Sequence, residues 1–213
     1  MANQKPHISL IDLMTEARQE LSGNWGIAIG FTVIYYLVSM GFGIVPFGFL
    51  IFSGPLLLGI VTFYLNLTRK GSHDIGDLFK GFDNFGNALL AYIIYFFAIL
   101  FGLLLLIVPG AILAIGWSQT FYIMHDDPNI NSVDALKKSW AMMDGYKADY
   151  FILALIFSLF SFLTVFTLFI GMLWLIPLMQ TTYAKFYDKI KYANFPEDDK
   201  GEEDDYASHL VDF

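Results

Sequence analysis

The sequence predicts an all-α integral membrane protein with six transmembrane helices, arranged as three hairpins that each follow an interfacial amphipathic helix. Of the 213 residues, 56% are hydrophobic and only 15% are charged, against about a quarter in a soluble domain. Residues 86–124 contain no charged side chain, a far longer run than the roughly 20 residues that cross a bilayer once. The apolar runs are continuous rather than alternating, which favours helices over a transmembrane barrel.

The first hairpin is predicted to follow an amphipathic helix in residues 7–22. The apolar face of this helix carries Ile8, Ile11, Met14, Ala17 and Leu21. Trp25 marks the depth of the lipid headgroups, because tryptophan is enriched at that level. We therefore expect the first span at 25–43 and the second at 48–66, joined by a turn without charge. Glycines in and near the spans are expected to allow close helix approach or tight turns, namely Gly41, Gly43, Gly54, Gly59 and Gly102.

The second hairpin is predicted after the polar residues 67–85. A short amphipathic helix in this segment is indicated by the helical spacing of Ile75, Leu78, Phe79 and Phe82. Spans are expected at 86–106 and 108–125, because Pro109 and Gly110 interrupt the long apolar run near its middle. The two spans then form a tight hairpin.

The third hairpin is predicted after the polar residues 126–149. Asn131 or Ser132 can cap an amphipathic helix in this segment. One face of that helix carries Val133, Leu136, Trp140 and Met143. Spans are expected at 150–168 and 170–187, again with a turn that carries no charge.

A spacing between glycines and aromatic residues suggests that the three hairpins are copies of one unit. Each glycine lies 41 residues before an aromatic residue, in the pairs Gly23 and Tyr64, Gly81 and Tyr122, and Gly145 and Phe186. Three such units can pack around a pseudo-threefold axis. The alternative is that any membrane protein built from hairpins alternates polar and apolar segments in this way.

Charge is confined to one side of this arrangement. All 12 Lys and Arg residues and all 20 Asp and Glu residues lie in the terminal segments or in the two polar segments between the hairpins. The positive-inside rule therefore places both termini and both polar segments in the cytoplasm. Residues 1–195 then form one membrane domain, and residues 196–213 form an acidic tail that we expect to be disordered. Nothing offers a basic stripe, so nucleic acid is not an expected partner.

Catalytic, cofactor and metal sites are not expected. The chain has no cysteine, and its four histidines lack the spacing of metal ligands. Three alternatives stay open. The sequence His125-Asp126-Asp127 can bind a cation at the membrane surface, and the acidic tail can gather Ca²⁺ loosely. An enzyme would need a cluster drawn from the polar segments, namely Asp74, Asp83, Asn84, Asp126 and Asp144.

Neutral polar side chains inside the spans are the remaining candidates for function. The candidate intramembrane polar contacts are Ser53, Gln119, Thr120, Gln180 and Thr181. Such side chains more often bond across helices or to carbonyls of their own helix than line a path. Gln119 and Gln180 occupy similar positions near the cytoplasmic ends of spans 4 and 6. If they converge, they form a polar vestibule that opens to the cytoplasm.

Several short motifs point to a known family. They are Gly23-Asn24-Trp25-Gly26, Ser53-Gly54-Pro55, Leu78-Phe79-Lys80-Gly81-Phe82 with Asn84-Phe85-Gly86, Ile107-Val108-Pro109-Gly110 and Trp174-Leu175-Ile176-Pro177-Leu178-Met179-Gln180. Together they resemble the bacterial multipass family catalogued as domain of unknown function 975, over about residues 10–192. The resemblance implies a bacterial cytoplasmic-membrane (inner-membrane) protein with six helices and brings no established activity. That family is similar to the membrane domains of some glycerophosphoryl diester phosphodiesterases, but no such catalytic domain is evident here.

Our leading hypothesis is a non-catalytic inner-membrane protein that acts from its cytoplasmic face as a scaffold or accessory factor for membrane proteins or lipids. Charge on one side and three amphipathic helices at the inner leaflet motivate it. The expected partners are membrane lipids and a protein that docks on the cytoplasmic loops or the acidic tail. The alternative is a transporter or permease-like protein for a neutral or lipidic substrate. A continuous polar cavity between the hairpins would distinguish this alternative.

Overall fold

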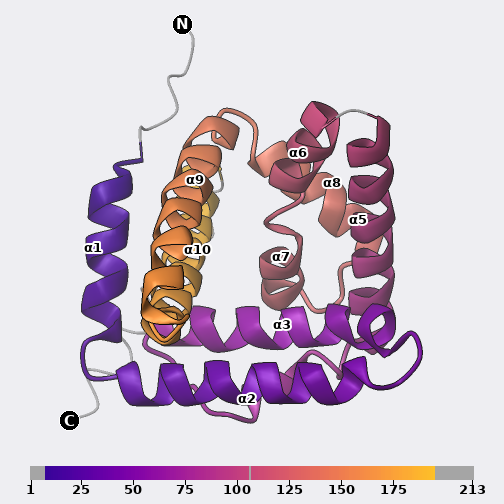
Figure 1. The fold of residues 1–213 in the computed structure, drawn as a ribbon. Helices are drawn as coiled ribbons and strands as arrows, with labels where there is room; N and C mark the ends of the chain where they lie inside the picture. The colour runs from indigo at the N-terminus through magenta and orange to yellow at the C-terminus, as the bar shows by residue number, and fades with distance from the viewer. Residues whose placement is uncertain (1–7, 106, 195–213) are drawn as a thin grey trace, which may run out of the picture.

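The computed structural model describes residues 8–105 and 107–194, and every regular element in these ranges is helical (Figure 1). The elements are α1 (Leu10–Leu21), α2 (Trp25–Gly43), α3 (Gly48–Thr68), α4 (Asp77–Lys80), α5 (Phe85–Leu105), α6 (Ile107–Gly116), α7 (Thr120–Asp126), α8 (Ser132–Met142), α9 (Lys147–Leu163), the 3₁₀ helix η1 (Thr164–Thr167) and α10 (Met172–Asn194). The predicted all-α class is confirmed for this part of the chain. The acidic tail, His7 and His209 lie outside the described residues.

Four helical stretches are long and apolar enough to cross a membrane. They are Trp25–Gly43, Gly48–Thr68, Phe85–Leu104 and Lys147–Thr167, the last of which runs through α9 and η1. Their bounds agree closely with the first, second, third and fifth predicted spans. These helices support the prediction of a membrane protein.

Helix α3 is the centre of the fold. Its most apolar stretch is 67% buried inside the protein, whereas those of the other three long helices are only 17–22% buried. Figure 1 shows α2 and α3 side by side along the bottom of the view, with α5, α7 and α10 meeting α3 from above. The three hairpins therefore pack against one shared helix, and the remaining long helices keep broad outer faces for lipid.

Two glycines bring the second hairpin close to α3, as the sequence predicts. A Cβ atom on Gly54 would collide with the backbone carbonyl of Ala88 on α5. A Cβ atom on Gly59 would collide in the same way with the carbonyl of Leu78 on α4. Only glycine permits backbone contact this close, so these positions fix how α4 and α5 cross α3.

The fourth predicted span, residues 108–125, is divided into α6 and α7. The helix stops at Gly116 and resumes at Thr120. Ser139 of α8 bridges this break, because its hydroxyl donates to the Gly116 carbonyl (2.9 Å) and accepts from the backbone N–H of Gln119 (3.1 Å). The side chain thereby satisfies buried backbone groups that the interrupted helix leaves open.

The sixth predicted span, residues 170–187, lies within the longer helix α10, which continues to Asn194. The first charged side chain of α10 is Lys185, about three and a half turns after the helix starts at Met172. The uncharged part of α10 is therefore shorter than the roughly 20 residues of a complete span.

The amphipathic helices bury their apolar faces inside the protein. In α1 the buried side chains are Leu13, Ala17 and Leu21, which lie one turn apart and pack mainly towards α10. Ile11, which the sequence places on the apolar face, is instead 78% exposed. Leu13, Ala17 and Leu21 are four residues apart and share the helix face that packs on α10, and Ile11 points away from that face.

The two later amphipathic helices differ from each other in length. Helix α8 begins after Asn131, whose side chain accepts a hydrogen bond from the Asp134 N–H (2.9 Å), as the predicted cap requires. It buries Leu136, and Met143 just beyond its end, whereas Val133 and Trp140 stay partly exposed. The helix predicted within residues 67–85 is a single turn, α4.

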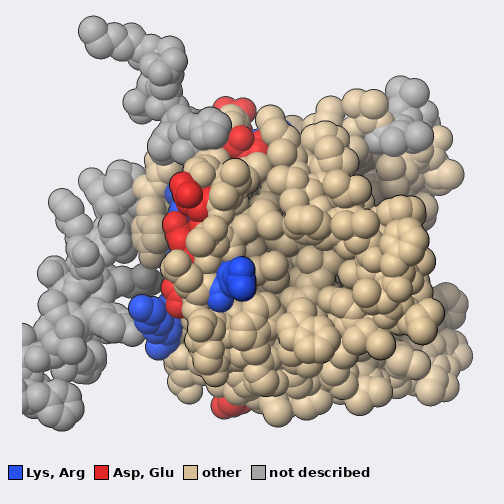
Figure 2. Space-filling view, turned by 60° about the vertical axis from the view of Figure 1, so that its left-hand side comes forward, with Lys and Arg blue, Asp and Glu red and all other residues tan. Residues whose placement is uncertain are grey.

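The surface is divided between a charged edge and a broad uncharged area. Figure 2 shows Lys, Arg, Asp and Glu side chains gathered along one side of the view, while the rest of this face carries almost no charge. Large apolar side chains are exposed on α2, α5 and α9. A contiguous apolar surface of this kind is typical of contact with lipid or with another protein.

Candidate functional site

Three helices end at a common cluster of charged side chains, here called the ion-pair cluster. Arg69 directly follows α3, Asp126 ends α7, and Asp188 lies on the last part of α10. Lys191, one turn after Tyr187 on α10, completes it. Each of the three hairpins therefore contributes a charged residue from its second arm.

The geometry of the ion-pair cluster is that of charge-assisted hydrogen bonds. The Arg69 guanidinium donates to both carboxylate oxygens of Asp126, at 2.7 and 3.2 Å, and to one oxygen of Asp188, at 2.7 Å. Lys191 Nζ lies 3.0 Å from Asp126, and the Tyr187 hydroxyl donates to the same carboxylate at 2.7 Å. The two cations and two anions are only 14–21% exposed, so they depend on each other for solvation.

The two carboxylates of the ion-pair cluster differ in acidity. Burial alone would raise the pKa of Asp126, but the hydrogen bonds and charge of Arg69, with Tyr187 and Lys191, lower it to about 2. Burial raises the pKa of Asp188 despite its contact with Arg69. The pKa of Arg69 is raised, because its carboxylate partners outweigh the effect of burial. Asp188 is therefore the more easily neutralised carboxylate.

A cavity of about 220 Å³, here called the central cavity, lies between the three hairpins. Helix α3 contributes three aliphatic side chains, whereas α5, the break between α6 and α7, α7, α9 and α10 contribute aromatic and neutral polar ones. The lining residues are Leu57, Ile60, Val61, Tyr95, Trp117, Ser118, Phe121, Tyr122, Tyr150, Gln180 and Tyr183. Among the described residues that line it, none carries a charge at neutral pH.

Only one of the two glutamines whose convergence would form a polar vestibule lines the central cavity. Gln180 does so, with its side chain half-buried. Gln119, which directly follows Ser118 in the sequence, is buried. Its side-chain amide donates a hydrogen bond to the Ser118 hydroxyl at 2.7 Å. Ser118 then faces the cavity that Gln180 also lines.

The other three predicted polar residues bond to their own helices. The Thr120 hydroxyl donates to the Trp117 carbonyl and the Thr181 hydroxyl to the Pro177 carbonyl, at 2.7 and 2.8 Å. Ser53 donates to the Phe49 carbonyl and lines a separate hollow of about 200 Å³ on the α2–α3 hairpin. Such bonds satisfy a hydroxyl inside the membrane without a ligand.

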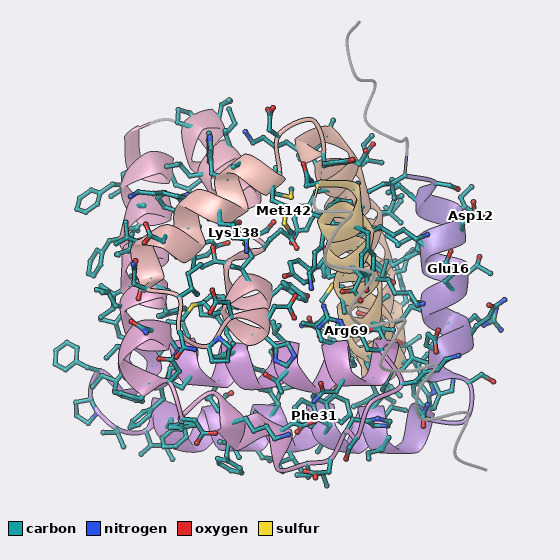
Figure 3. All side chains as sticks on the ribbon, turned by 180° about the vertical axis from the view of Figure 1, so that it is seen from behind. Asp12, Glu16, Phe31, Arg69, Lys138 and Met142 are labelled. Carbon is teal, nitrogen blue, oxygen red and sulfur yellow. The ribbon has the colours of Figure 1, made fainter. Side chains whose placement is uncertain are left out.

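Another hollow, of about 310 Å³ and here called the charged pocket, lies beside the ion-pair cluster. Its lining residues are Glu16, Thr68, Arg69, Lys185, Asp188, Lys189 and Tyr192. Lys189 contacts Glu16 at 2.8 Å and Lys185 contacts Glu20 at 3.1 Å, so ion pairs attach α1 to α10. Figure 3 shows Arg69 beside α10 and Glu16 on α1.

The residues named for a cation site or an enzyme do not form one cluster. Asp126 is held by Arg69 and Lys191, and His125 contacts the Thr62 hydroxyl (3.0 Å). Asn84 donates to the Pro128 carbonyl, and Asp74 accepts from the Gly76 N–H. Within residues 8–105 and 107–194, no group of three or more His, Asp or Glu side chains has the geometry to hold a metal ion.

The sequence analysis located the charged side of the protein but did not identify the ion-pair cluster. A signal was present in the proposed repeat. A threonine lies six or seven residues before each of three charged residues of the ion-pair cluster. The pairs are Thr62 and Arg69, Thr120 and Asp126, and Thr182 and Asp188. Similar positions in repeated units can meet when the units share an axis.

The described residues form an all-helical fold with four helices long and apolar enough to cross a membrane, a cavity between its hairpins and an ion-pair cluster at one end. Residues 94–194, from α5 to α10, match the model of a family described as protein of unknown function (DUF975). This agrees with the resemblance seen in the sequence over that region. No curated protein and no solved structure matches the chain, and the expected similarity to phosphodiesterase membrane domains is not shown.

Proposed function

We propose that this protein is a permease-like membrane protein that takes a neutral, partly apolar molecule into the central cavity without changing it covalently. The observation that carries the proposal is the lining of the central cavity by uncharged side chains, which are aliphatic in the first hairpin and mostly aromatic or polar in the other two. An ion in this cavity would lose its hydration without gaining a charged partner, at a cost of several kcal/mol. A neutral molecule incurs no such penalty.

The size of the central cavity limits the substrate. Its volume of about 220 Å³ is below the range of about 300–1,000 Å³ that is usual for pockets that hold drug-sized ligands. A smaller molecule, or one part of a lipid, fits this space. Tyrosine hydroxyls and the Gln180 amide would supply hydrogen bonds, and the aromatic rings would supply apolar contact.

The proposed setting is a bacterial cytoplasmic membrane that the chain crosses six times, with both termini in the cytoplasm. Four helices have the necessary length, and α6 with α7, together with α10, would serve as the other two crossings. Because Arg69 contacts both Asp126 and Asp188, the second arms of the three hairpins reach the same depth at these residues. This supports three repeated hairpins around a pseudo-threefold axis.

The scaffold hypothesis receives less support. It relied partly on amphipathic helices with apolar faces free to bind lipid or a partner. Most of the apolar face of α1 is buried inside the protein instead, and the predicted apolar face of α8 is only half available, since Leu136 and Met143 are buried whereas Val133 and Trp140 stay partly exposed. The scaffold hypothesis would then depend on a partner that docks on the cytoplasmic loops or on the acidic tail.

Co-purification tests the proposed function. We expect mass spectrometry of the protein, extracted from membranes in mild detergent, to detect a bound neutral compound. The substitution Val61→Phe places a ring in the central cavity and should abolish its retention. Val33→Phe adds the same ring on the exposed side of α2 and should leave retention unchanged. No bound compound in the wild type, or equal retention in both variants, would refute the proposal.

A further inference from the structure

The central cavity and the ion-pair cluster lie on the same faces of the same three helices. On α3, Val61 lines the cavity, Leu65 follows one turn later and Arg69 one turn after that. On α10, Tyr183 lines the cavity, and Tyr187 and Lys191 follow at four-residue steps. Residues four apart share a helix face, so each face leads from the cavity to the cluster.

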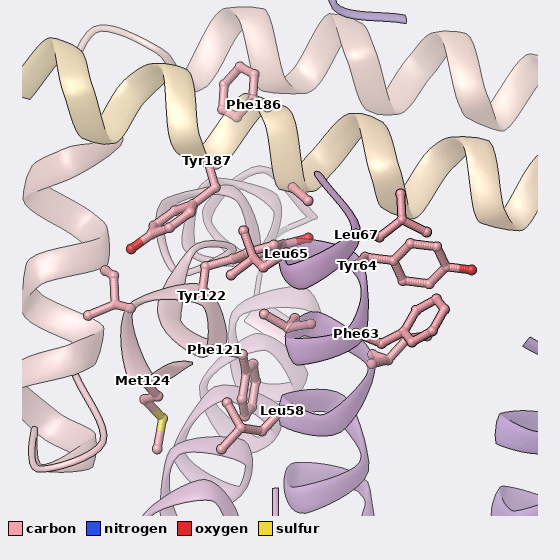
Figure 4. Close-up of a cluster of buried hydrophobic side chains, with 14 of the residues drawn as sticks. Leu58, Phe63, Tyr64, Leu65, Leu67, Phe121, Tyr122, Met124, Phe186 and Tyr187 are labelled. Atoms are coloured by element: carbon pink, nitrogen blue, oxygen red, sulfur yellow. The ribbon is translucent and has the colours of Figure 1, made fainter. Parts of the chain in front are cut away.

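A pair of stacked tyrosines connects the two features. Tyr122 lines the central cavity, and its ring stacks on that of Tyr187 with 5.1 Å between the centroids. The Tyr187 hydroxyl in turn donates a hydrogen bond to Asp126 of the ion-pair cluster. Figure 4 shows Tyr122, Tyr187 and Leu65 next to one another. These three side chains, here called the tyrosine layer, lie between the rest of the cavity lining and the ion-pair cluster.

The ion-pair cluster has a second hollow on its other side. Arg69 and Asp188 both line the charged pocket, whereas neither lines the central cavity. The tyrosine layer and the ion-pair cluster thus stand between an uncharged cavity among the hairpins and a charged pocket at their ends. This barrier is held by ion pairs, hydrogen bonds and ring stacking, and Arg69 and Asp188 within it also line the charged pocket.

We propose that the ion-pair cluster is a gate that closes the central cavity on the charged side. In the closed state Arg69 holds Asp126 of α7 and Asp188 of α10 together, and Tyr187 stays over the cavity through its bond to Asp126. Opening requires Arg69 to release one carboxylate, so that α10 can move away from α3 with Tyr187. This inference rests on the proposed function, because the gate regulates access to the cavity that would hold the substrate.

The absence of cysteine from the chain allows a direct test. A Ser118→Cys reporter places one thiol in the lining of the central cavity. Its rate of reaction with a membrane-impermeant, negatively charged thiol reagent is measured in membrane vesicles of both orientations. Asp188→Asn, added to the reporter, removes one of the two carboxylates that hold Arg69. We expect it to speed labelling about tenfold from the charged side, a shift of about 1.4 kcal/mol in the closed–open equilibrium.

Matched variants separate gating from general damage. Asp134→Asn removes the exposed ion pair with Lys137 on α8, far from the cavity lining, and should leave labelling unchanged. If Asp188→Asn fails to fold, Tyr187→Phe replaces it, because it removes only the hydroxyl that binds Asp126; the expected increase is about threefold. Labelling that stays at the parent rate in folded variants of the ion-pair cluster, or rises equally with Asp134→Asn, would overturn the gate.

This test does not depend on any ligand. If labelling rises but no compound co-purifies with the protein, the gate stands and the proposed substrate binding fails. If a compound is retained but labelling does not change, the cavity stands as a binding site and the gate is refuted.

Discussion

The two ends of the three hairpins are stabilised in different ways. At the charged end, Arg69 and Lys191 contact carboxylates inside the protein. At the turn end, Ile44, Phe47 and Leu168 are 85%, 81% and 82% exposed. Water disfavours an apolar surface of this kind, whereas lipid accommodates it. The charged end is thus held by pairing within the chain, and the turn end depends on the membrane around it.

The largest effect is expected when the ion-pair cluster loses its shared cation. Arg69→Ala leaves Asp126 and Asp188 with one cation between them, and should lower the free energy of unfolding by about 3–5 kcal/mol. Arg69→Lys should recover only part of this, because an ammonium cannot form the two-point contact with Asp126. Thermal unfolding in detergent measures both variants. Equal stability of Arg69→Ala and wild type would refute the role of the cluster.

Acid should weaken the charged end through Asp126. Its pKa is about 2 in the folded protein against an ordinary 3.8, so the ionised carboxylate stabilises the fold above its unfolded-state pKa. This contribution, about 2 kcal/mol, is lost as the pH falls from about 4 to about 2. Asp188 has the opposite sign: its pKa is raised, so the folded state gains its proton more readily than the unfolded state.

Melting curves from neutral pH into acid separate the two carboxylates. Wild-type protein should lose more stability over the acid range than Asp126→Asn, which lacks the titrating group. Asp188→Asn should lose at least as much stability over the acid range as wild type, because Asp126 is still present and the opposing contribution of Asp188 is gone. If wild type and Asp126→Asn lost stability in parallel as the pH falls, Asp126 would not be the source of the acid dependence.

At the turn end, one substitution is expected to raise the free energy of unfolding, by less than the changes predicted for the charged end. Phe47 has a left-handed backbone conformation, with φ of 60°, although its side chain makes few contacts inside the protein. Phe47→Gly relieves this conformation and should raise stability by about 1 kcal/mol. Phe49→Gly, within the first turn of α3, removes a similar exposed ring from a helical position and should lower stability by a similar amount. Loss of stability in Phe47→Gly would contradict the prediction.

The smallest effect concerns the attachment of α1. Glu20→Gln removes the charge from the 3.1 Å contact with Lys185 and should cost about 1 kcal/mol, because Lys185 keeps Glu16 within 3.9 Å. The difference from wild type should shrink in high salt, which screens such pairs. Arg18→Gln on the exposed side of the same helix serves as the control. An effect of Glu20→Gln that is unchanged by salt would argue against an electrostatic attachment.

The sequence was sufficient for features that depend on local composition. The apolar stretches that became α2, α3 and α5 were long, without charge and bounded by polar residues, so their bounds could be predicted closely. Gly54 and Gly59 could be identified as sites of close approach because few other roles suit a glycine inside such a helix. The cap at Asn131 was evident from its position before a helical pattern.

Features that depend on long-range contacts could not be predicted. The break between α6 and α7 is stable because Ser139, about 20 residues later in the chain, satisfies its backbone. The ion-pair cluster joins Arg69 to residues that lie 57 and 119 positions away. Ile11 was assigned to the wrong face because several faces of α1 carry apolar side chains, and only the position of α10 selects one.

Cysteine accessibility in intact cells tests most directly whether the two ends of the hairpins lie on opposite sides of the membrane. Single reporters would be Ile44→Cys and Leu168→Cys at the turn end, and Ile75→Cys and Lys137→Cys at the charged end, in a chain with no cysteine of its own. We predict that an impermeant thiol reagent labels the first two from outside and reaches the last two only after the membrane is opened. Labelling of Ile75→Cys or Lys137→Cys in sealed cells would contradict this threading, and with it a charged side that faces the cytoplasm.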